Sequence, residues 1–479
     1  MILKNTKNII FKILSLSLVF SFLCSVPVKA IDYKKLAEER KSMEIQSNTY
    51  DNWPLGPAIG AQAAILMDAN TGSILYAKNI HEQLYPASIT KLLTTYIAVK
   101  ECELDEMVTF SEEAVHSINW WEDANMGVNA GASLTLEEVL YGILVGSANE
   151  AAYAVAEHIS GSLENFAILM NKTAKELGCK NSNFVTPNGI HDDNHYTSAY
   201  DMALIAKAFF AEETLEKMSG TTRFDVPVTD TQTREGIILS AKSQLLPGKP
   251  YAYEPLIGTK TGYTDSARQT LVSCAEKNGL KLICVILKEE TPAQFTDTIE
   301  LFNYGFDNFE ALHLNEVNNP YNIDNHFFTR DIDLLGSSKT ILSLNKEDYI
   351  ILPNTISFED LTSRVSYDNK EETSVACINY YYKNYLLGKI NVKLAVDEPV
   401  VFDFSTQKMN TVDIIETDSK NTIFINVIHL LMGFIVLTIL ITIIFSIKSF
   451  ARNKNIAKRR KNKLRRNILH GNHWDIHKF

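Results

Sequence analysis

A serine and a lysine stand three residues apart in the segment Ser88-Ile89-Thr90-Lys91. On a helix this spacing puts both side chains on one face. The amine of Lys91 can then take the proton of the Ser88 hydroxyl, provided that the amine is neutral. Burial and a second cation nearby would lower the pKa of the lysine in that direction. At a helix start, the backbone N–H of Ser88 would be free to bind an oxyanion.

Single motifs of this kind are common, and their order along the chain is more specific. S-x-x-K recurs at Ser343 and Ser405, and S-x-N occurs at Ser117 as well as at Ser147-Ala148-Asn149. Lys260-Thr261-Gly262 occurs once, on an expected strand, where the glycine lets another backbone or a ligand approach closely. The S-x-N at 147 lies 59 residues after the S-x-x-K serine at 88, and K-T-G follows 113 residues later. The S-x-x-K copies at 343 and 405 fall after K-T-G and cannot fill that order.

The hydrophobic pattern predicts the elements that must position these motifs. Strands at 63–68 and 73–77 flank Asn70-Thr71-Gly72 as a hairpin. A buried helix follows the turn at 85–88, and Thr135-x-x-Glu138 is a capping box for another. Further helices are expected at 148–159, 163–177, 198–210 and 293–304, and further strands at 256–262, 269–275 and 280–287. Strands at both ends with helices between them indicate an α+β fold, in which one antiparallel sheet packs against helical layers.

The order S-x-x-K, S-x-N, K-T-G resembles that of the penicillin-recognising serine enzymes, which include β-lactamases and penicillin-binding proteins. Longer segments narrow the resemblance to the serine D-alanyl-D-alanine carboxypeptidases, the low-molecular-weight penicillin-binding proteins. These segments are 84–91, Thr186-Pro187-Asn188-Gly189, 196–203 and 260–264. The resemblance implies a penicillin-binding/β-lactamase-like transpeptidase domain, then a small β-rich domain and a C-terminal membrane anchor. It rests on motifs over 60–310 and mainly on position over 312–404.

The resemblance also implies a role for each motif residue. Ser88 would be the acylated nucleophile, and Lys91 its general base. Ser147 and Asn149 would pass protons and hold the substrate amide. Lys260 and Thr261 would bind the substrate's terminal carboxylate. The backbone N–H groups of Ser88 and Tyr263 would form the oxyanion hole, and Gly262 in the K-T-G segment is also expected to be a substrate-binding residue. No cofactor and no metal are implied.

Two positions depart from the family pattern. Ala148 stands inside S-x-N, and Arg268 stands after K-T-G-x-T-x-x-A, where glycine is usual at both places. Each departure would alter substrate fit without removing a catalytic group. His191 and His195 lie in a loop with Asp192 and Asp193, but no zinc-binding spacing accompanies them. The pattern is more typical of a solvated loop than of a metal site.

Charge is segregated along the chain. Residues 31–447 hold 31 Lys+Arg against 56 Asp+Glu, and the acidic balance argues against nucleic acid as a partner. Residues 1–30 carry four lysines, an apolar run and a small-residue cleavage site after Ala30, as a signal peptide does. The 25 residues 423–447 contain no Asp, Glu, Lys or Arg, and eleven Lys+Arg follow in 448–479. By the positive-inside rule, a transmembrane helix at 423–447 would keep the basic tail cytoplasmic and the acidic body outside.

These observations predict the organisation of the chain. A polar lead-in at 31–56 precedes the catalytic domain at 57–311. The β-rich domain covers 312–404, and a stem at 405–422 leads to the membrane span. Five cysteines would remain after cleavage, with no C-x-x-C among them, and we expect buried thiols rather than a disulfide framework.

The expected function is removal of the terminal D-alanine from peptidoglycan stem peptides, with β-lactams acylating the same serine. A class A β-lactamase would need a second carboxylate base in an E-x-x-L-N-like loop, and 150–259 contains none. A penicillin sensor would need an N-terminal membrane signalling module, whereas the only mature span expected here is C-terminal. A D,D-endopeptidase would share every motif and remains an alternative.

Overall fold

The computed structural model describes residues 32–314, 342–345, 347–367 and 374–394. They belong to the first of two compact units, residues 1–398. The signal peptide, stem, membrane span and basic tail expected at 1–30, 405–422, 423–447 and 448–479 lie outside the described residues, as do parts of 312–404. Within the described ranges, the helices are all too short or too polar to cross a bilayer.

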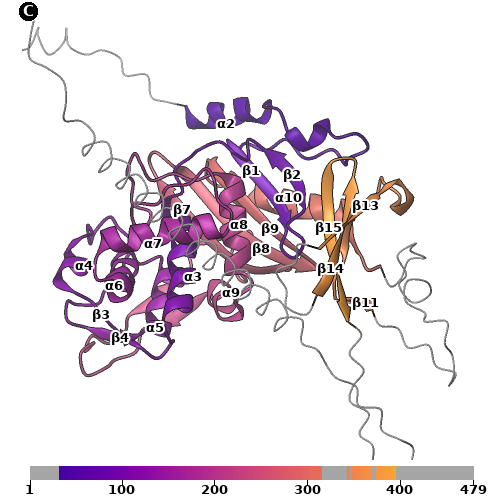
Figure 1. Ribbon diagram of the computed structural model, residues 1–479. Coiled ribbons are helices and arrows are strands. Elements are labelled where there is room, and N and C mark those ends of the chain that lie inside the picture. Colours follow the sequence, from indigo (N-terminus) through magenta and orange to yellow (C-terminus); the bar gives the residue numbers. More distant parts are fainter. Residues whose placement is uncertain (1–31, 315–341, 346, 368–373, 395–479) are drawn as a thin grey trace, which may run out of the picture. The chain divides into compact units, whose positions relative to one another are not determined.

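A five-stranded antiparallel sheet forms the centre of the catalytic region (Figure 1). Its strand order is β2-β1-β9-β8-β7. The bounds are β1 Ala63–Asp68, β2 Ile74–Lys78, β7 Leu256–Thr264, β8 Arg268–Lys277 and β9 Leu280–Glu289. Because β1 pairs with β9, the N-terminal hairpin and the later strands join one sheet, which confirms the antiparallel sheet predicted from the sequence.

The two faces of this sheet are covered differently. Successive residues of a strand point to opposite faces. Ile65 and Val285 therefore pack into the cluster made with the helices between β2 and β7. Leu66 and Ile286 pack into a second cluster with α10 (Ala293–Asn308). The strands are buried on both faces, so the sheet is a rigid support for residues on its edge.

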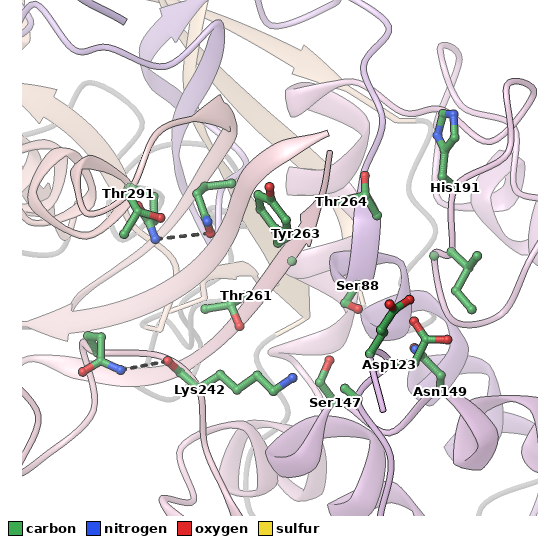
Figure 2. A pocket seen from close by; sticks show the side chains of 18 of the residues that line it. Ser88, Asp123, Ser147, Asn149, His191, Lys242, Thr261, Tyr263, Thr264 and Thr291 are labelled. Carbon is green, nitrogen blue, oxygen red and sulfur yellow. Dashed lines mark hydrogen bonds between the residues drawn. The ribbon is translucent and has the colours of Figure 1, made fainter. Parts of the chain in front are cut away.

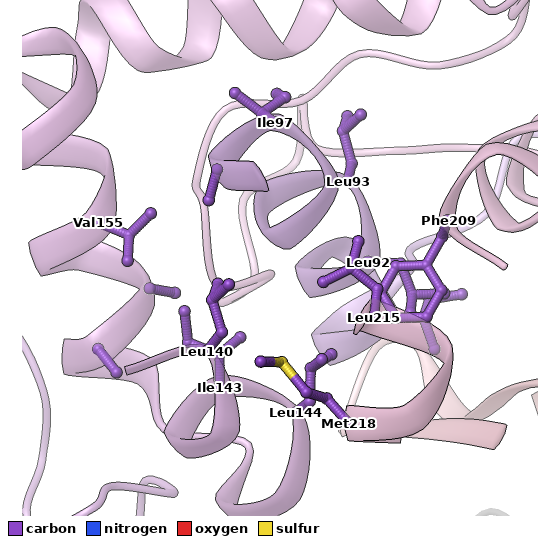
Figure 3. Packing of buried hydrophobic residues seen from close by; sticks show 14 of the residues in the cluster. Leu92, Leu93, Ile97, Leu140, Ile143, Leu144, Val155, Phe209, Leu215 and Met218 are labelled. Carbon is purple, nitrogen blue, oxygen red and sulfur yellow. The ribbon is translucent and has the colours of Figure 1, made fainter. Parts of the chain in front are cut away.

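The helices between β2 and β7 form the layer that carries half of the site. They are α3 Lys91–Glu101, α4 Glu112–His116, α5 Leu136–Tyr141, α6 Asn149–Ser160, α7 Leu163–Glu176, α8 Ala199–Phe209 and α9 Glu213–Ser219. The capping box predicted at Thr135 and Glu138 starts α5. Leu92 and Leu93 of α3 lie in the core of this layer with Leu140, Val155 and Phe209 (Figure 3). Helix α3 is thus held from several sides.

Small elements flank this body. Helix α2 (Tyr33–Lys41) precedes the sheet. Two small two-stranded sheets lie among the helices: β3 Met107–Thr109 with β4 Ser133–Thr135, and β5 Arg223–Asp225 with β6 Ile238–Ser240.

A second sheet follows α10, with strand order β10-β12-β15-β14-β13 and β11 paired to β15. The bounds are β10 Phe309–Leu312, β11 Leu342–Leu344, β12 Ile350–Pro353, β13 Thr362–Ser366, β14 Ser374–Tyr382 and β15 Tyr385–Leu394. The Tyr349 hydroxyl donates to Asp68 Oδ2 over 3.0 Å, which links this sheet to the central one. Strand β10 straddles the domain boundary expected between 311 and 312, and that boundary stays a prediction.

Candidate active site

Ser88 lies on a short 3-10 helix, Ala87–Thr90, that leads directly into α3. The predicted helix start is therefore a tighter turn than an α-helix, although its first N–H groups still lack intrahelical acceptors. Ala87 has a positive φ of 52°, and a Cβ on Gly189 would lie 1.9 Å from the Ala87 carbonyl oxygen. From the other side, the Thr270 hydroxyl donates to the Pro86 carbonyl over 2.8 Å. The backbone on both sides of Ser88 is thus fixed.

Lys91 is completely buried behind Ser88. Its Nζ lies 2.9 Å from Ser88 Oγ, 2.7 Å from Asn149 Oδ1 and 2.6 Å from the Asn188 carbonyl oxygen. Burial holds the pKa of Lys91 well below its usual range, and the charges of Lys260 and Lys242 lower it further. A neutral amine has two hydrogens. Asn149 Oδ1 and the Asn188 carbonyl oxygen can only accept hydrogen bonds, so each would take one of these hydrogens. The amine's lone pair is left facing the Ser88 hydroxyl, as a general base requires.

Ser147 follows a π-helical turn, Gly142–Gly146, and adopts a left-handed conformation with φ 60°. For a residue with a side chain this conformation is strained, and such strain clusters at functional sites. The Lys260 amine donates to Ser147 Oγ and to the Thr261 carbonyl, each over 2.9 Å. Burial, reinforced by Lys242, lowers the pKa of Lys260 to about 7. Ser147 therefore connects β7 to the start of α6.

Strand β7 runs beside the 3-10 helix because of Gly262. A Cβ on Gly262 would lie 2.8 Å from the Ser88 backbone nitrogen and 2.4 Å from Thr270 Oγ1. Only glycine allows this approach, which was the reason for expecting close contact at K-T-G. The next residue, Tyr263, is half exposed, and its hydroxyl donates to Asp265 over 2.9 Å.

The two departures from the family pattern have different structural outcomes. Arg268 has a positive φ of 55°, which explains why glycine is usual there. Its guanidinium binds Glu290 with Nη2 2.7 Å from Oε2, stacks 3.7 Å from the Tyr33 ring centroid and donates to Tyr263 Oη over 3.2 Å. Ala148 has φ −59°, which any residue adopts. Arg268 thus ties helix α2 and Tyr263 together, whereas Ala148 is simply tolerated.

A cavity of about 600 Å³ opens in front of these residues (Figure 2). Six of the sequence-predicted residues line it: Ser88, Ser147, Asn149, Thr261, Gly262 and Tyr263. The other two, Lys91 and Lys260, are buried and reach the lining serines through hydrogen bonds. The structure therefore brings all eight predicted residues to one place.

Several neighbours were not anticipated. Lys242 lines the cavity, and burial lowers its pKa, yet it stands in an irregular segment without a motif. The backbone carbonyl of Asn188 accepts a hydrogen bond from Lys91 Nζ. The only signal for this contact in the sequence is that Asn188 belongs to the T-P-N-G segment. Glu150 is buried beside Asn149, and its Oε1 accepts a hydrogen bond from the Met126 N–H over 2.6 Å. Burial raises the pKa of Glu150 to about 7.

The prediction of a solvated histidine loop was wrong for His195, which is only 2% exposed. Its Nδ1 accepts from the backbone N–H of Val185 and of Thr186, each over 3.1 Å, so its Nε2–H must donate to Thr90 Oγ1 at 2.9 Å. Burial lowers the pKa of His195 to about 4. A neutral His195 therefore links the backbone before the T-P-N-G segment to the 3-10 helix that carries Ser88. The acidic neighbours misled the prediction because local charge does not report tertiary burial.

The group of side chains that could hold a metal ion lies away from the cavity. Within the described ranges, one cluster qualifies, formed by Cys102, Glu106 and His158 with ligand atoms within 4.8 Å of one another. Cys102 caps the end of α3 opposite Lys91, a helix length of roughly 16 Å. Among the five cysteines described, Cys274, Cys284 and Cys377 are buried, as predicted, whereas Cys102 and Cys179 are only partly buried.

Known proteins resemble the part of the chain that forms this site. The sequence profile of the D-alanyl-D-alanine carboxypeptidases matches residues 50–291. The D-alanyl-D-alanine carboxypeptidase DacF of Bacillus subtilis is 34% identical over 262 residues, which cover 52% of this chain and 63% of the relative. For DacA of Haemophilus influenzae the identity is 34% over 263 residues, covering 53% and 64%. The match thus spans slightly less than two thirds of these relatives. The crystal structure of penicillin binding protein 5 from Haemophilus influenzae aligns with a TM-score of 0.55 at 27% identity, covering 71% of this chain and 98% of that one.

Proposed function

Because the chain belongs to the family of D-alanyl-D-alanine carboxypeptidases, we propose that it removes the terminal D-alanine from peptidoglycan stem peptides through an acyl-enzyme on Ser88. β-Lactams would acylate the same serine. The observation that carries the proposal is the buried amine of Lys91, whose pKa is held well below its usual range by burial. Its Nζ lies 2.9 Å from Ser88 Oγ and is also held by Asn149 Oδ1 and the Asn188 carbonyl oxygen.

In the first step Ser88 Oγ attacks the carbonyl carbon of the penultimate D-alanine while its proton passes to Lys91 Nζ. The new oxyanion is stabilised by backbone N–H groups at Ser88 and Tyr263. Breakage of the C–N bond releases D-alanine, whose amine takes up a proton through Ser147. Water then hydrolyses the ester and restores Ser88.

The cations at the cavity suit a substrate with a free carboxylate beside the scissile bond. Lys260 and Thr261 bind this carboxylate in the proposed complex, and Asn149 holds the substrate amide. A bound carboxylate favours the charged form of Lys260, whose pKa is about 7 without substrate. A charged Lys260 in turn disfavours protonation of Lys91, so substrate binding itself keeps the base neutral.

We also propose that the catalytic body lies outside the cell membrane and that a single span at 423–447 leaves the tail cytoplasmic. The support is the segregation of charge, with eleven basic residues and one acid in 448–479. Protease added to intact spheroplasts should digest the body and spare the tail. Loss of the tail alone would contradict this topology.

The activity is tested by incubating the purified full chain with a peptide ending in D-Ala-D-Ala and measuring free D-alanine. We expect release by the wild type and none by Ser88→Ala. A cross-linked peptide dimer in a parallel reaction tests the endopeptidase alternative, which predicts faster cleavage of the dimer. Rapid turnover of penicillin would favour a β-lactamase, and a stable adduct without D-alanine release would favour a sensor.

A further inference from the structure

Trp121 is the most exposed of the large apolar side chains described, at 96%. The turn that carries it is well held. Asn119 donates its backbone N–H to Asp123 Oδ2 over 2.8 Å and accepts from the Trp121 N–H at its own Oδ1 over 3.2 Å. The indole N–H of Trp120 donates to the Val115 carbonyl over 3.1 Å, which anchors the turn to α4. The Trp121 ring is therefore presented to solvent by an ordered backbone.

A hollow of about 710 Å³ lies against this turn. One wall is formed by Trp120, Trp121 and residues 125–127, and the other by the segment 234–239. Arg234 joins the walls, since its Nη1 donates to the Gly127 carbonyl over 2.9 Å. Ile238, on the second wall, is also half exposed. The hollow thus combines apolar side chains with polar ones, as ligand sites do.

The hollow and the catalytic cavity share one loop. Glu122, Asp123 and Ala124 line the cavity, while Trp121 and Asn125 on either side of them line the hollow. Figure 2 shows Asp123 beside Asn149 at the cavity wall. Three residues of backbone, from 121 to 124, span at most about 10 Å. A stem peptide of about five residues spans up to roughly 17 Å. The cavity wall at 122–124 and the hollow at Trp121 are therefore closer together than the length of such a peptide.

We propose that this hollow binds an N-acetylhexosamine ring of the glycan strand that carries the stem peptide. The inference rests on the proposed function, because the stem peptide must enter the neighbouring cavity. One face of a pyranose ring presents C–H groups, which pack on the negative face of an indole. The acetamido and hydroxyl groups at the ring edge find donors and acceptors in Arg234, Glu235 and Asn125. One arginine and one glutamate give the hollow no net charge, which suits an uncharged sugar better than a phosphate.

The test compares kcat/KM for a free pentapeptide with that for the same peptide attached to its disaccharide. We expect the wild-type full chain to prefer the disaccharide substrate. Trp121→Ala should lower kcat/KM for that substrate by about 2- to 10-fold, which is the effect of losing one aromatic contact. The free pentapeptide should be cleaved at the wild-type rate by this variant. Tyr367→Ala is the matched control, since Tyr367 is 81% exposed directly after β13. It should change kcat/KM for neither substrate.

Three results would overturn the inference. The wild type could show no preference for the disaccharide substrate, Trp121→Ala could slow both substrates equally, or it could change neither. The last result would be expected if the hollow served a protein partner. If the wild type cleaves neither substrate, the proposed function itself fails. Quenching of tryptophan fluorescence by the free disaccharide, lost in Trp121→Ala, then tests the sugar site separately, and no quenching in the wild type would overturn it.

Discussion

The amine of Lys260 donates a hydrogen bond to the hydroxyl of Ser147 over 2.9 Å, although the two residues are 113 positions apart in the chain. This contact joins the edge strand of the central sheet to the helical layer across the cavity. The contact thereby holds together the Lys260 amine, which could bind a carboxylate, and the Ser147 hydroxyl, which could transfer a proton. On the helical side, Asn149 extends the same network to Lys91 and Ser88.

Replacement of the base should stop acylation while leaving the nucleophile in place. Lys91→Met keeps the length of the side chain but removes the amine that faces Ser88 Oγ. We expect the rate of penicillin acylation to fall by about 10²- to 10⁴-fold, the usual contribution of a general base. Lys172→Met is the control, because the Lys172 side chain is 68% exposed on α7. Rapid-quench labelling with a fluorescent penicillin measures both, and a Lys91→Met rate within a few-fold of wild type would contradict the role.

The third lysine, Lys242, should set the position of the pH–rate profile. Lys260 is charged below its pKa of about 7, so carboxylate binding by the free enzyme weakens as the pH rises through that value. The charge of Lys242 lowers the pKa values of both Lys260 and Lys91. Lys242→Met should therefore move both limbs of the kcat/KM profile for D-alanine release to higher pH. A profile that falls in height without moving would mean that Lys242 only contacts the substrate.

The candidate catalytic groups could be predicted from the sequence because their spacing is local or their order is distinctive. Ser88 and Lys91 share a helix face by spacing alone, and K-T-G occurs only once. Lys242 and the Asn188 carbonyl were not predicted, because only their place in the folded chain, and no local sequence pattern, brings them to the site. A lysine in an irregular segment looks like any surface lysine, and every residue has a carbonyl. The burial of His195 depends on packing between 185–195 and α3, which no local pattern reports.

Backbone conformation was equally hidden. The sequence showed Arg268 as a departure from glycine, but only the positive φ of 55° gives the physical reason. The same holds for Ser147, whose φ of 60° depends on the π-helical turn before it. The helices and strands that were predicted lie within a few residues of their expected positions, because hydrophobic periodicity determines them. The short elements α2, α4, α9 and β3 to β6 were not predicted.

Substitutions at Arg268 should separate backbone strain from side-chain contacts. Both Arg268→Ala and Arg268→Gly remove the ion pair with Glu290, but only glycine relieves the positive φ. We expect the glycine variant to be more stable than the alanine variant by about 1–2 kcal/mol in urea unfolding. At Arg364 on β13, the order should reverse, because glycine weakens a strand. An alanine variant at 268 as stable as the glycine variant would show that the strain is absent.

The most direct test of the account is the intact mass of the chain after exposure to benzylpenicillin. The wild type should gain the mass of one penicillin, and Ser88→Ala should gain none. Ser343→Ala removes the serine of another S-x-x-K segment and should keep the full adduct. A penicillin adduct that persists on folded Ser88→Ala would contradict the assignment of Ser88 as the nucleophile.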